Sequence, residues 1–145
     1  METKERNSQK LKINKKFVPC LVNEGDELYK NGYFVFNITT LIKYIHENLS
    51  DFIPEFIKIK EFTKEFSLLN ENLVDSVAVS EPVIIAEITP DNYNLIDGNH
   101  RVEKARRLGI KSIMAYRLNV YQHIRFLTSK ESYLAYIQYW NSKLQ

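Results

Sequence analysis

The sequence predicts one small α/β domain of the α+β type, and three observations support this. The chain has 145 residues, the size of a single domain of roughly 100–200 residues. Hydrophobic residues make up 44% and charged residues 26% of it, as in globular proteins that bury a core. Short runs of aromatic and β-branched residues alternate with segments whose apolar residues recur at threes and fours, which indicates both strands and helices.

Residues 1–16 carry six basic and two acidic side chains and show no sustained apolar periodicity. We expect a flexible basic arm there and the folded domain over residues 17–145. The arm is interpreted in two ways, as a nucleic-acid-binding tail or as a terminus without a binding role.

Positions 33–38 are rich in aromatic and β-branched residues, so a short strand is expected there. Thr39 or Thr40 can cap a following helix, whose apolar positions continue to Leu49. A second helix is predicted over residues 55–73, because apolar side chains again recur at helical spacing. Those side chains are Phe56, Ile59, Phe62, Phe66 and Leu69.

Glycine and proline divide the second half of the chain more clearly. Residues 82–88 and 93–96 are predicted to form a hairpin through a proline-containing turn. A helix is predicted over residues 99–108, with Gly109 where a helix-terminating glycine belongs. Alternating apolar residues predict a third strand over residues 112–118.

Two further helices are expected, over residues 120–127 and 130–144. Nearly the whole circumference of the last one is apolar or aromatic, through Tyr133, Leu134, Tyr136, Ile137, Tyr139 and Trp140. Ordinary core packing is one interpretation of this helix, and a homodimer surface is the other.

Composition excludes several classes of protein. The longest apolar run is five residues, from Tyr133 to Ile137, whereas a membrane span needs about 20. The first sixteen residues are polar and basic, which is unlike a signal peptide. Cys20 is the single cysteine, so an internal disulfide and a multi-cysteine zinc site are excluded. We therefore expect a cytoplasmic protein with no membrane partner.

The net charge of +2 conceals a strong asymmetry along the chain. Residues 1–16 carry +4, residues 17–97 carry −9 and residues 98–130 carry +7. A basic block beside a motif indicates an anionic ligand such as a nucleotide or nucleic acid. The alternative is a positive face that packs beside the acidic half of the chain.

The stretch from Leu95 to Ala105 has the clearest chemical content. A predicted strand ends at Gly98, and a helix begins at once with His100 and Arg101. A helix N-terminus exposes unpaired N–H groups and about half a positive charge, which favours phosphate. Gly98 lets an anion approach the backbone, while Arg101 offers a planar fork of donors and His100 a further one. The turn is therefore a candidate anion site.

Asp97 does not fit a bare anion site, because a carboxylate repels phosphate, and two interpretations resolve this. The carboxylate can hold a Mg²⁺ ion that bridges to phosphates, since magnesium commonly uses one or two carboxylates plus phosphate oxygens. Alternatively, Asp97 accepts hydrogen bonds from the helix start or pairs with Arg101, which is a structural role.

The motif elements are Ile96-Asp97-Gly98-Asn99-His100-Arg101, Ala105, Leu108-Gly109 and the strand around Ile113. Together they resemble the core signature of the ParB/sulfiredoxin superfamily (the ParB-like nuclease domain), and most of all its Asp-Gly-x-His-Arg members. The likeness covers residues 83–118, and a looser one covers residues 33–49. The resemblance implies a single ParB/sulfiredoxin-like domain in which helices flank a small mixed sheet.

Members of this superfamily that bind nucleotides with this turn include CTP-binding partition proteins, ATP-dependent sulfiredoxins and free-serine kinases. By position, the residues implied to contact the phosphates of ATP or CTP are Gly98, Asn99, His100 and Arg101. We expect catalytic roles for Asp97, His100 and Arg101, with Mg²⁺ at Asp97 as the first of its two interpretations.

Three departures limit the resemblance. Asn99 stands where sulfiredoxins need a cysteine as the reducing nucleophile, so sulfiredoxin chemistry is not expected. Only 27 residues follow Leu118, too few for the helix-turn-helix and dimerisation domains of partition proteins. The serine kinases carry a catalytic carboxylate in their N-terminal half, for which the candidates here are Glu24, Glu27, Glu47 and Glu55.

The expected function is NTP-dependent phosphoryl transfer or NTP hydrolysis, with a nucleotide as the ligand. One alternative is a non-catalytic nucleic-acid-binding module of the ParB type that uses residues 98–130 and the arm. Another is a family member that keeps the fold as an interaction scaffold. His46 and His123 are expected to be surface or satisfied histidines, because no metal-ligand spacing surrounds them.

Overall fold

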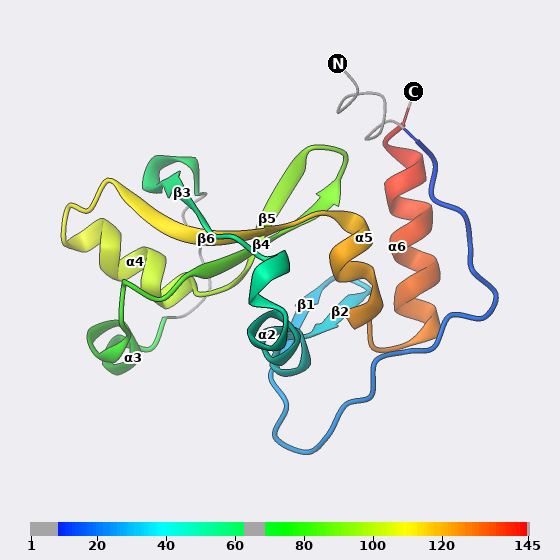
Figure 1. The fold of residues 1–145 in the computed structure, drawn as a ribbon, viewed down its shortest axis with the longest axis horizontal. Coiled ribbons are helices and arrows are strands. Elements are labelled where there is room, and N and C mark those ends of the chain that lie inside the picture. Colours follow the sequence, from blue (N-terminus) through cyan, green and yellow to red (C-terminus); the bar gives the residue numbers. More distant parts are fainter. Residues whose placement is uncertain (1–8, 63–68, 145) are drawn as a thin grey trace.

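The computed structural model describes residues 9–62 and 69–144 (Figure 1). Within them the chain forms a two-stranded sheet, a four-stranded sheet and five α-helices. The strands are β1 (Leu28–Asn31), β2 (Phe34–Asn37), β3 (Glu55–Lys58), β4 (Val83–Thr89), β5 (Asn92–Asp97) and β6 (Ser112–Leu118). The helices are α2 (Ile38–Glu47), α3 (Glu71–Ser76), α4 (Asn99–Arg107), α5 (Val120–His123) and α6 (Lys130–Ser142). None of these helices is long and apolar enough to cross a membrane.

The four-stranded sheet is mixed and has the order β3-β6-β4-β5. β4 pairs antiparallel with β5 and parallel with β6, while β3 pairs antiparallel with β6. The chain is therefore the small α+β domain that the sequence predicts. Since β5 is an edge strand, its end at Asp97 and the start of α4 lie at the edge of the sheet.

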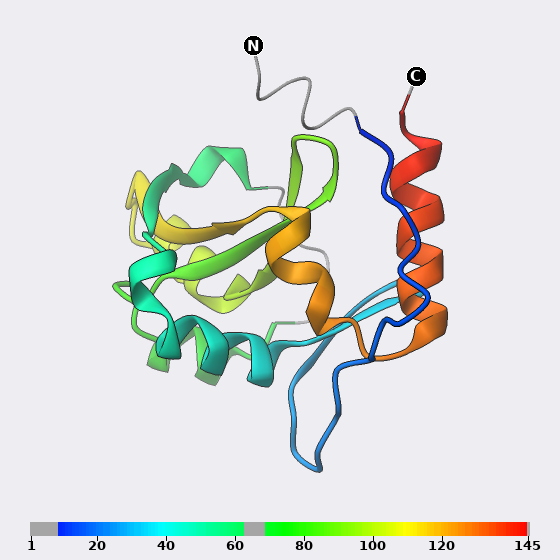
Figure 2. The same ribbon diagram turned by 45° about the vertical axis from the view of Figure 1, so that its right-hand side comes forward.

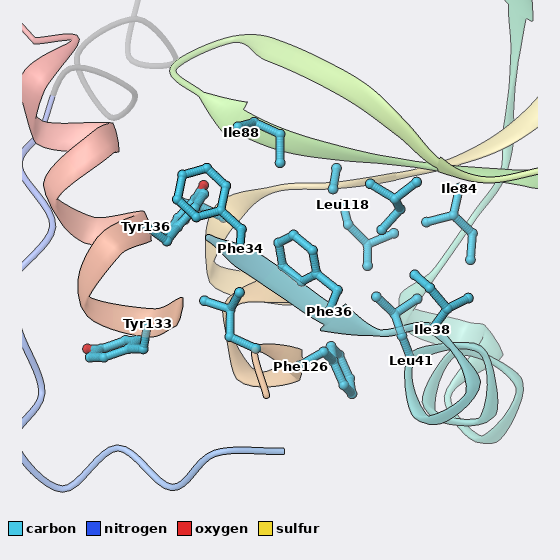
Figure 3. Close-up of a cluster of buried hydrophobic side chains, with 14 of the residues drawn as sticks. Phe34, Phe36, Ile38, Leu41, Ile84, Ile88, Leu118, Phe126, Tyr133 and Tyr136 are labelled. Atoms are coloured by element: carbon cyan, nitrogen blue, oxygen red, sulfur yellow. The ribbon is translucent and has the colours of Figure 1, made fainter. Parts of the chain in front are cut away.

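Hydrophobic side chains lie on both faces of this sheet. Because side chains alternate along a strand, Val83 and Ile84 of β4 point to opposite faces. Ile84 belongs to the larger core, together with Leu41 of α2 (Figure 3). Val83 belongs to the smaller core, together with Val102 and Ala105 of α4. Helix α4 is thus fixed against the face of the sheet opposite α2.

The second half of the chain agrees closely with the prediction. β4 and β5 form the expected antiparallel hairpin, and β6 covers residues 112–118 as predicted. Helix α4 ends before Gly109, whose φ of 74° is the left-handed conformation expected of a terminating glycine. Leu108 was expected on the inner side of this helix, but it is 62% exposed, because the helix ends at Arg107.

The helix predicted over residues 55–73 is wrong. The segment contains β3, a 3₁₀ turn at Ile59–Glu61 and the start of α3, whereas Phe66 lies outside the described residues. Pairing with β6 overrides the helical spacing, because Ile57 is buried beside its partner Ile113 while Phe56 is 70% exposed. A periodic run of aromatic residues therefore did not form one buried face.

The first half also differs in detail. The strand expected at residues 33–38 is β2, but it pairs with β1, which was not predicted. Helix α2 is capped by Asn37, whose side chain accepts the Thr40 N–H at 3.0 Å, rather than by Thr39 or Thr40. The helix ends at Glu47, before the predicted apolar position Leu49.

Helix α6 packs into the larger core. Tyr136, Ile137 and Trp140 are buried, and the Tyr136 ring meets the edge of Phe34 at 5.3 Å between centroids (Figure 3). Core packing within one chain therefore explains the spacing of its aromatic residues. The homodimer stays a prediction, for which the exposed Leu134 and Tyr139 remain available.

The flexible arm predicted for residues 1–16 is wrong for its second half. Residues 9–16 run beside α6 in both views (Figure 1 and Figure 2). Leu11 is buried, and its N–H and C=O bond to the side-chain amide of Asn141 at 2.8 and 3.1 Å. The Trp140 indole N–H donates to the Gln9 backbone carbonyl at 3.0 Å. Aromatic and amide groups of α6 thus give the segment partners that its own periodicity did not reveal.

A buried polar cluster joins β4 to α5 and α6. Glu87 is 1% exposed, and its carboxylate accepts the backbone N–H groups of Asp91 at 2.9 Å and Val120 at 3.1 Å. Its backbone carbonyl accepts the Tyr136 hydroxyl at 2.7 Å and the His123 Nε2–H at 2.6 Å. Within the described residues, His123 Nδ1 is buried with no hydrogen-bond partner. His123 is thus a core histidine, as expected, but only its Nε2 has a hydrogen-bond partner among the described residues.

Removal of residues 1–16 should lower the melting temperature by at least about 4 °C, because the buried side chain of Leu11 contributes roughly 1.5–3 kcal/mol. A truncation that starts at residue 9 keeps these contacts and serves as the comparison in thermal unfolding. Equal melting temperatures for the two truncations would show that the segment contributes nothing to stability.

The pH dependence of stability should contain a contribution from His123. Burial lowers the pKa of this imidazole to about 4, while an unfolded histidine titrates near 6.5. The neutral form is kept on folding, so stability falls as the pH drops from about 6.5 towards 4, by up to roughly 3 kcal/mol. Urea unfolding across this range should show a smaller loss for His123→Gln, and an unchanged loss for exposed His46→Gln. An identical slope in all three proteins would refute the assignment.

Candidate functional site

The turn between β5 and α4 depends on a glycine. Gly98 has φ of 106°, in the left-handed region, and a Cβ built on it would lie 2.5 Å from Val83 Cγ1. Contacts between carbon atoms in proteins are about 3.5–4.0 Å, so no other residue fits without movement of β4. The sequence interpretation of Gly98 was close approach of a ligand to the backbone. In the structure the close approach is to Val83.

The N-terminus of α4 differs from the other helix starts in the described chain. Side chains of Asn37, Asn70, Asn119 and Ser129 cap α2, α3, α5 and α6. Gly98, the N-cap residue of α4, has no side chain to do so. The first N–H groups of a helix have no partner within the helix. At α4 they are therefore left available to a ligand.

Arg101 is held in place by protein oxygens. Its Nη2 donates to Asp97 Oδ2 at 2.8 Å, and its Nη1 donates to the Pro82 carbonyl at 3.1 Å. Glu81 Oε2 lies 3.7 Å from Nη1. The Asp97–Arg101 pairing that the sequence left open is thus present. Both terminal nitrogens of the guanidinium therefore already donate to protein oxygens. A contact of Arg101 with a ligand stays a prediction.

His100 connects the turn to α3. Its Nε2 accepts the Asn70 N–H at 3.3 Å, so in the neutral ring the proton lies on Nδ1. Lys104 Nζ, one turn further along α4, donates to the Asp75 and Val77 carbonyls at 2.7 and 2.9 Å at the end of α3. Helix α3 is therefore fixed at both ends to the polar side of α4.

A cavity of about 860 Å³ opens at the turn, large enough for a cofactor-sized ligand. The whole motif Asp97–Arg101 lines it, including Asn99. Residues 27–30, Ile42 and residues 76–78 form the remainder of its wall with Glu81, Leu95 and Ile96. The structure therefore brings together all five residues that the sequence singled out.

Glu27 is the one of the four candidate carboxylates that lines this cavity. Its backbone is fixed at the start of α2, since its N–H donates to Thr39 Oγ1 at 2.8 Å and its carbonyl accepts the Ile38 N–H at 2.8 Å. Glu24 is in an exposed turn, Glu47 ends α2, and Glu55 pairs with Arg117 at 3.2 Å on β3. Glu27 is distinguished from the other three only by the fold, which brings its segment beside the motif at Asp97–Arg101.

The cavity raises the pKa of two carboxyl groups. Loss of water around Asp97 raises its pKa, although Arg101 acts in the opposite direction. Loss of water and the charge of Asp97 raise the pKa of Glu27, while Arg101 and His100 oppose this. The charges of Asp97 and Arg101 therefore act on the pKa of Glu27, and the charge of Arg101 acts on the pKa of Asp97, as expected for groups around one site.

The described residues contain no group of three or more His, Cys, Asp or Glu that could hold a metal ion by themselves. Asp97 Oδ2 already accepts from Arg101. A Mg²⁺ ion fits this cavity only as a partner of bound phosphates, with carboxylate and water oxygens completing its coordination. The Mg²⁺ ligand role of Asp97 stays a prediction.

The basic stretch 98–130 does not form a free positive face. Six of its eight cations have protein partners: Arg101, Lys104, Arg106, Arg107, Arg117 and Arg125. Arg107, for example, donates two hydrogen bonds to the Glu71 carboxylate, at 2.7 and 3.1 Å. These contacts favour the interpretation that the basic block packs beside the acidic half of the chain.

No protein-family model matches the chain, and no curated protein matches its sequence. The likeness to the ParB/sulfiredoxin superfamily therefore stays a prediction from the motif.

Gly98→Ala should destabilise the fold, because the new Cβ meets Val83 and the backbone is left-handed. Overpacking costs roughly 1–3 kcal/mol, and the left-handed conformation costs about 1–2 kcal/mol more. Gly109→Ala is the matched control, since its φ is also positive but no atom lies within 4 Å of the added Cβ. Urea unfolding should show the larger loss for Gly98→Ala. Similar losses would mean that contact with Val83 is unimportant.

Proposed function

We propose that the protein binds a nucleoside triphosphate with its phosphates at the start of α4 and catalyses transfer of the terminal phosphoryl group, to water or to a hydroxyl acceptor. The observation that carries this proposal is the helix start without a side-chain cap, which opens into a cavity of about 860 Å³. A helix N-terminus offers N–H donors and positive potential to an anion.

The residues around this helix start suit polyphosphate binding. Asn99, His100 and Arg101 supply the exposed N–H groups, and the neutral His100 ring keeps an Nδ1–H donor while its Nε2 is engaged by Asn70. Lys30 of β1 lines the same cavity and adds a cation. These groups counter the charge of the phosphate oxygens, which is the main requirement of phosphoryl transfer.

Glu27 is proposed as the general base. Its carboxylate would take the proton from the attacking hydroxyl as the new bond to the terminal phosphorus forms and the bond to the leaving nucleoside diphosphate breaks. A raised pKa makes a carboxylate a better proton acceptor near neutral pH. Its backbone is held at the wall of the cavity by the start of α2, which supports this role.

The cavity wall also includes three carboxylates, Glu27, Glu81 and Asp97. They would repel a bare polyphosphate, so a divalent cation is proposed to accompany the nucleotide. Mg²⁺ bound by phosphate oxygens and Asp97 would neutralise charge on the transferred group. In that complex Arg101 would keep Asp97 oriented through the 2.8 Å contact.

The identity of the nucleotide, ATP or CTP, and membership of the ParB/sulfiredoxin superfamily belong to this proposal, as does a cytoplasmic location. The nucleotide and the family rest on the motif Asp97–Arg101 and its place at the cavity, whereas the location rests on the single cysteine, which suits a reducing compartment. The nucleic-acid-binding alternative has less support, because partners within the chain already engage most of the basic stretch 98–130.

The proposal predicts binding without turnover in Glu27→Gln. Thermal shifts with ATP, CTP, GTP and ADP, each with and without Mg²⁺, should identify a triphosphate that stabilises the protein more when Mg²⁺ is present. Glu27→Gln should bind this triphosphate within about twofold of wild type but release the diphosphate about 10²- to 10⁴-fold more slowly. The rate should fall on the acid side with an apparent pKa above the ordinary glutamate value, since the pKa of Glu27 is raised.

Glu24→Gln is the matched control, because this exposed residue precedes Glu27 in the same loop and should keep full activity. Failure of every triphosphate to bind would overturn the proposal. Binding without turnover in the wild type would leave a nucleotide-binding module and remove the catalytic part.

A further inference from the structure

A separate cavity, of about 630 Å³, lies beside the segment 9–18. Residues of this segment supply one part of its lining, Tyr121 and Ile124 a second, and Tyr133 and Ile137 of α6 a third. Figure 2 shows the segment running along α6. Among the described residues, none lines both this cavity and the one at the start of α4. The proposed phosphoryl chemistry therefore does not use it.

The charged side chains that line this cavity are all cations. They are Lys10, Lys12, Lys16 and Arg125, and no carboxylate of the described residues lies among them. The three lysines form no salt bridge within the described parts of the chain. Much of the remaining lining is aliphatic or aromatic, and Tyr121 is 49% exposed. A ligand that carries both negative charge and apolar groups therefore complements this cavity.

The segment also has an unpaired backbone edge. Side chains of α6 engage the Gln9 carbonyl and both the N–H and the carbonyl of Leu11. The described residues contain no cis peptide bond, and across a trans peptide bond the C=O and N–H groups point in opposite directions. The N–H and carbonyl of Lys10 and the N–H of Lys12 therefore point away from those α6 side chains. These three groups form no hydrogen bond within the described chain.

Such an edge can be extended by a peptide strand, which is a recurring mode of peptide recognition. Residues in register in a strand pair share a face. Lys10 and Lys12 are exposed, whereas Leu11 between them is buried in the larger core. Acidic side chains of an added strand suit the positions beside the lysines, and an apolar side chain suits the position beside Leu11. The segment therefore favours a peptide in which acidic and apolar residues alternate.

A peptide fits this surface better than a single-stranded nucleic acid does. Proteins that bind single strands stack successive bases on aromatic rings. Phe17 and Tyr133 stack on each other with ring centroids 3.9 Å apart, so one face of each ring is already covered. The free backbone edge of Lys10 presents both a donor and an acceptor. A peptide backbone offers both partners, whereas phosphodiester oxygens only accept.

We propose that the segment 9–12 and this cavity form a docking site for an extended peptide of a partner protein, in which acidic residues alternate with apolar ones. The peptide backbone pairs with Lys10 and Lys12, its carboxylates lie beside the two ammonium groups, and its apolar side chains pack towards the cavity. This interaction goes beyond the proposed function and does not depend on it.

Fluorescence anisotropy with two labelled octapeptides of equal composition tests this. One alternates Glu and Val, and the other carries its four Glu before its four Val. The alternating peptide should bind at least about threefold more tightly, because only it presents carboxylates to the lysines and apolar side chains to the other face along one edge.

The double variant Lys10→Glu with Lys12→Glu places like charges beside the peptide carboxylates. It should weaken the alternating peptide at least about fivefold. Lys15→Glu with Lys43→Glu is the matched control, since it changes the net charge equally at two exposed residues that do not line the cavity. At physiological ionic strength this control should change binding by less than about twofold. Thermal unfolding of each variant confirms that it is folded.

The inference is overturned if the alternating peptide does not bind at up to about 1 mM, if the block peptide binds as tightly, or if the control variant weakens binding as much as the Lys10 and Lys12 variant. It is also overturned if labelled oligothymidylate binds more tightly than the alternating peptide and loses this binding in the Lys10 and Lys12 variant, since the surface would then be a nucleic-acid groove. Each of these results leaves the proposed function intact, because nucleotide binding at α4 is measured separately.

Discussion

The close packing of Gly98 against Val83 is the constraint on which the rest of the site depends. The glycine turns the chain from β5 directly into α4 with a φ of 106°, and the absence of a Cβ lets β4 lie against the turn. The same absence of a side chain leaves α4 without a cap. One residue thus sets both the tight packing and the exposed helix start.

The charged groups around this turn act as a frame for it. Arg101 joins the end of β5, through Asp97, to the Pro82 carbonyl before β4. His100 and Lys104 fix α3 to α4. Because Arg101 and Lys104 are engaged by the protein, the donors proposed for an anion are the backbone N–H groups of the helix start, the His100 Nδ1–H and Lys30. Such a preorganised arrangement binds anions with little loss of side-chain entropy.

Much of this arrangement could be predicted from the sequence, because it is local. The run from Pro82 to Leu118 contains its own turn residues, and its hairpin, helix and final strand form nearly as predicted. The helix predicted over residues 55–73 was wrong because strand pairing with β6 overrode the helical spacing of these residues. The flexible arm was wrong for residues 9–16 because their partners lie on α6, about 130 positions away in the chain. The motif was predictable because its residues are consecutive in the chain, whereas the place of Glu27 beside it depends on the fold.

Amide chemical shifts of ¹⁵N-labelled protein, titrated with ATP, CTP or GTP and Mg²⁺, test the central claim most directly. If phosphates bind the start of α4, the largest changes should fall on the Asn99, His100 and Arg101 amides, because these N–H groups change from solvent to phosphate. Changes centred instead on the basic segment 10–16 and Arg125, or spread evenly over the surface, would contradict the account, since the ligand would then be held by side-chain charge elsewhere.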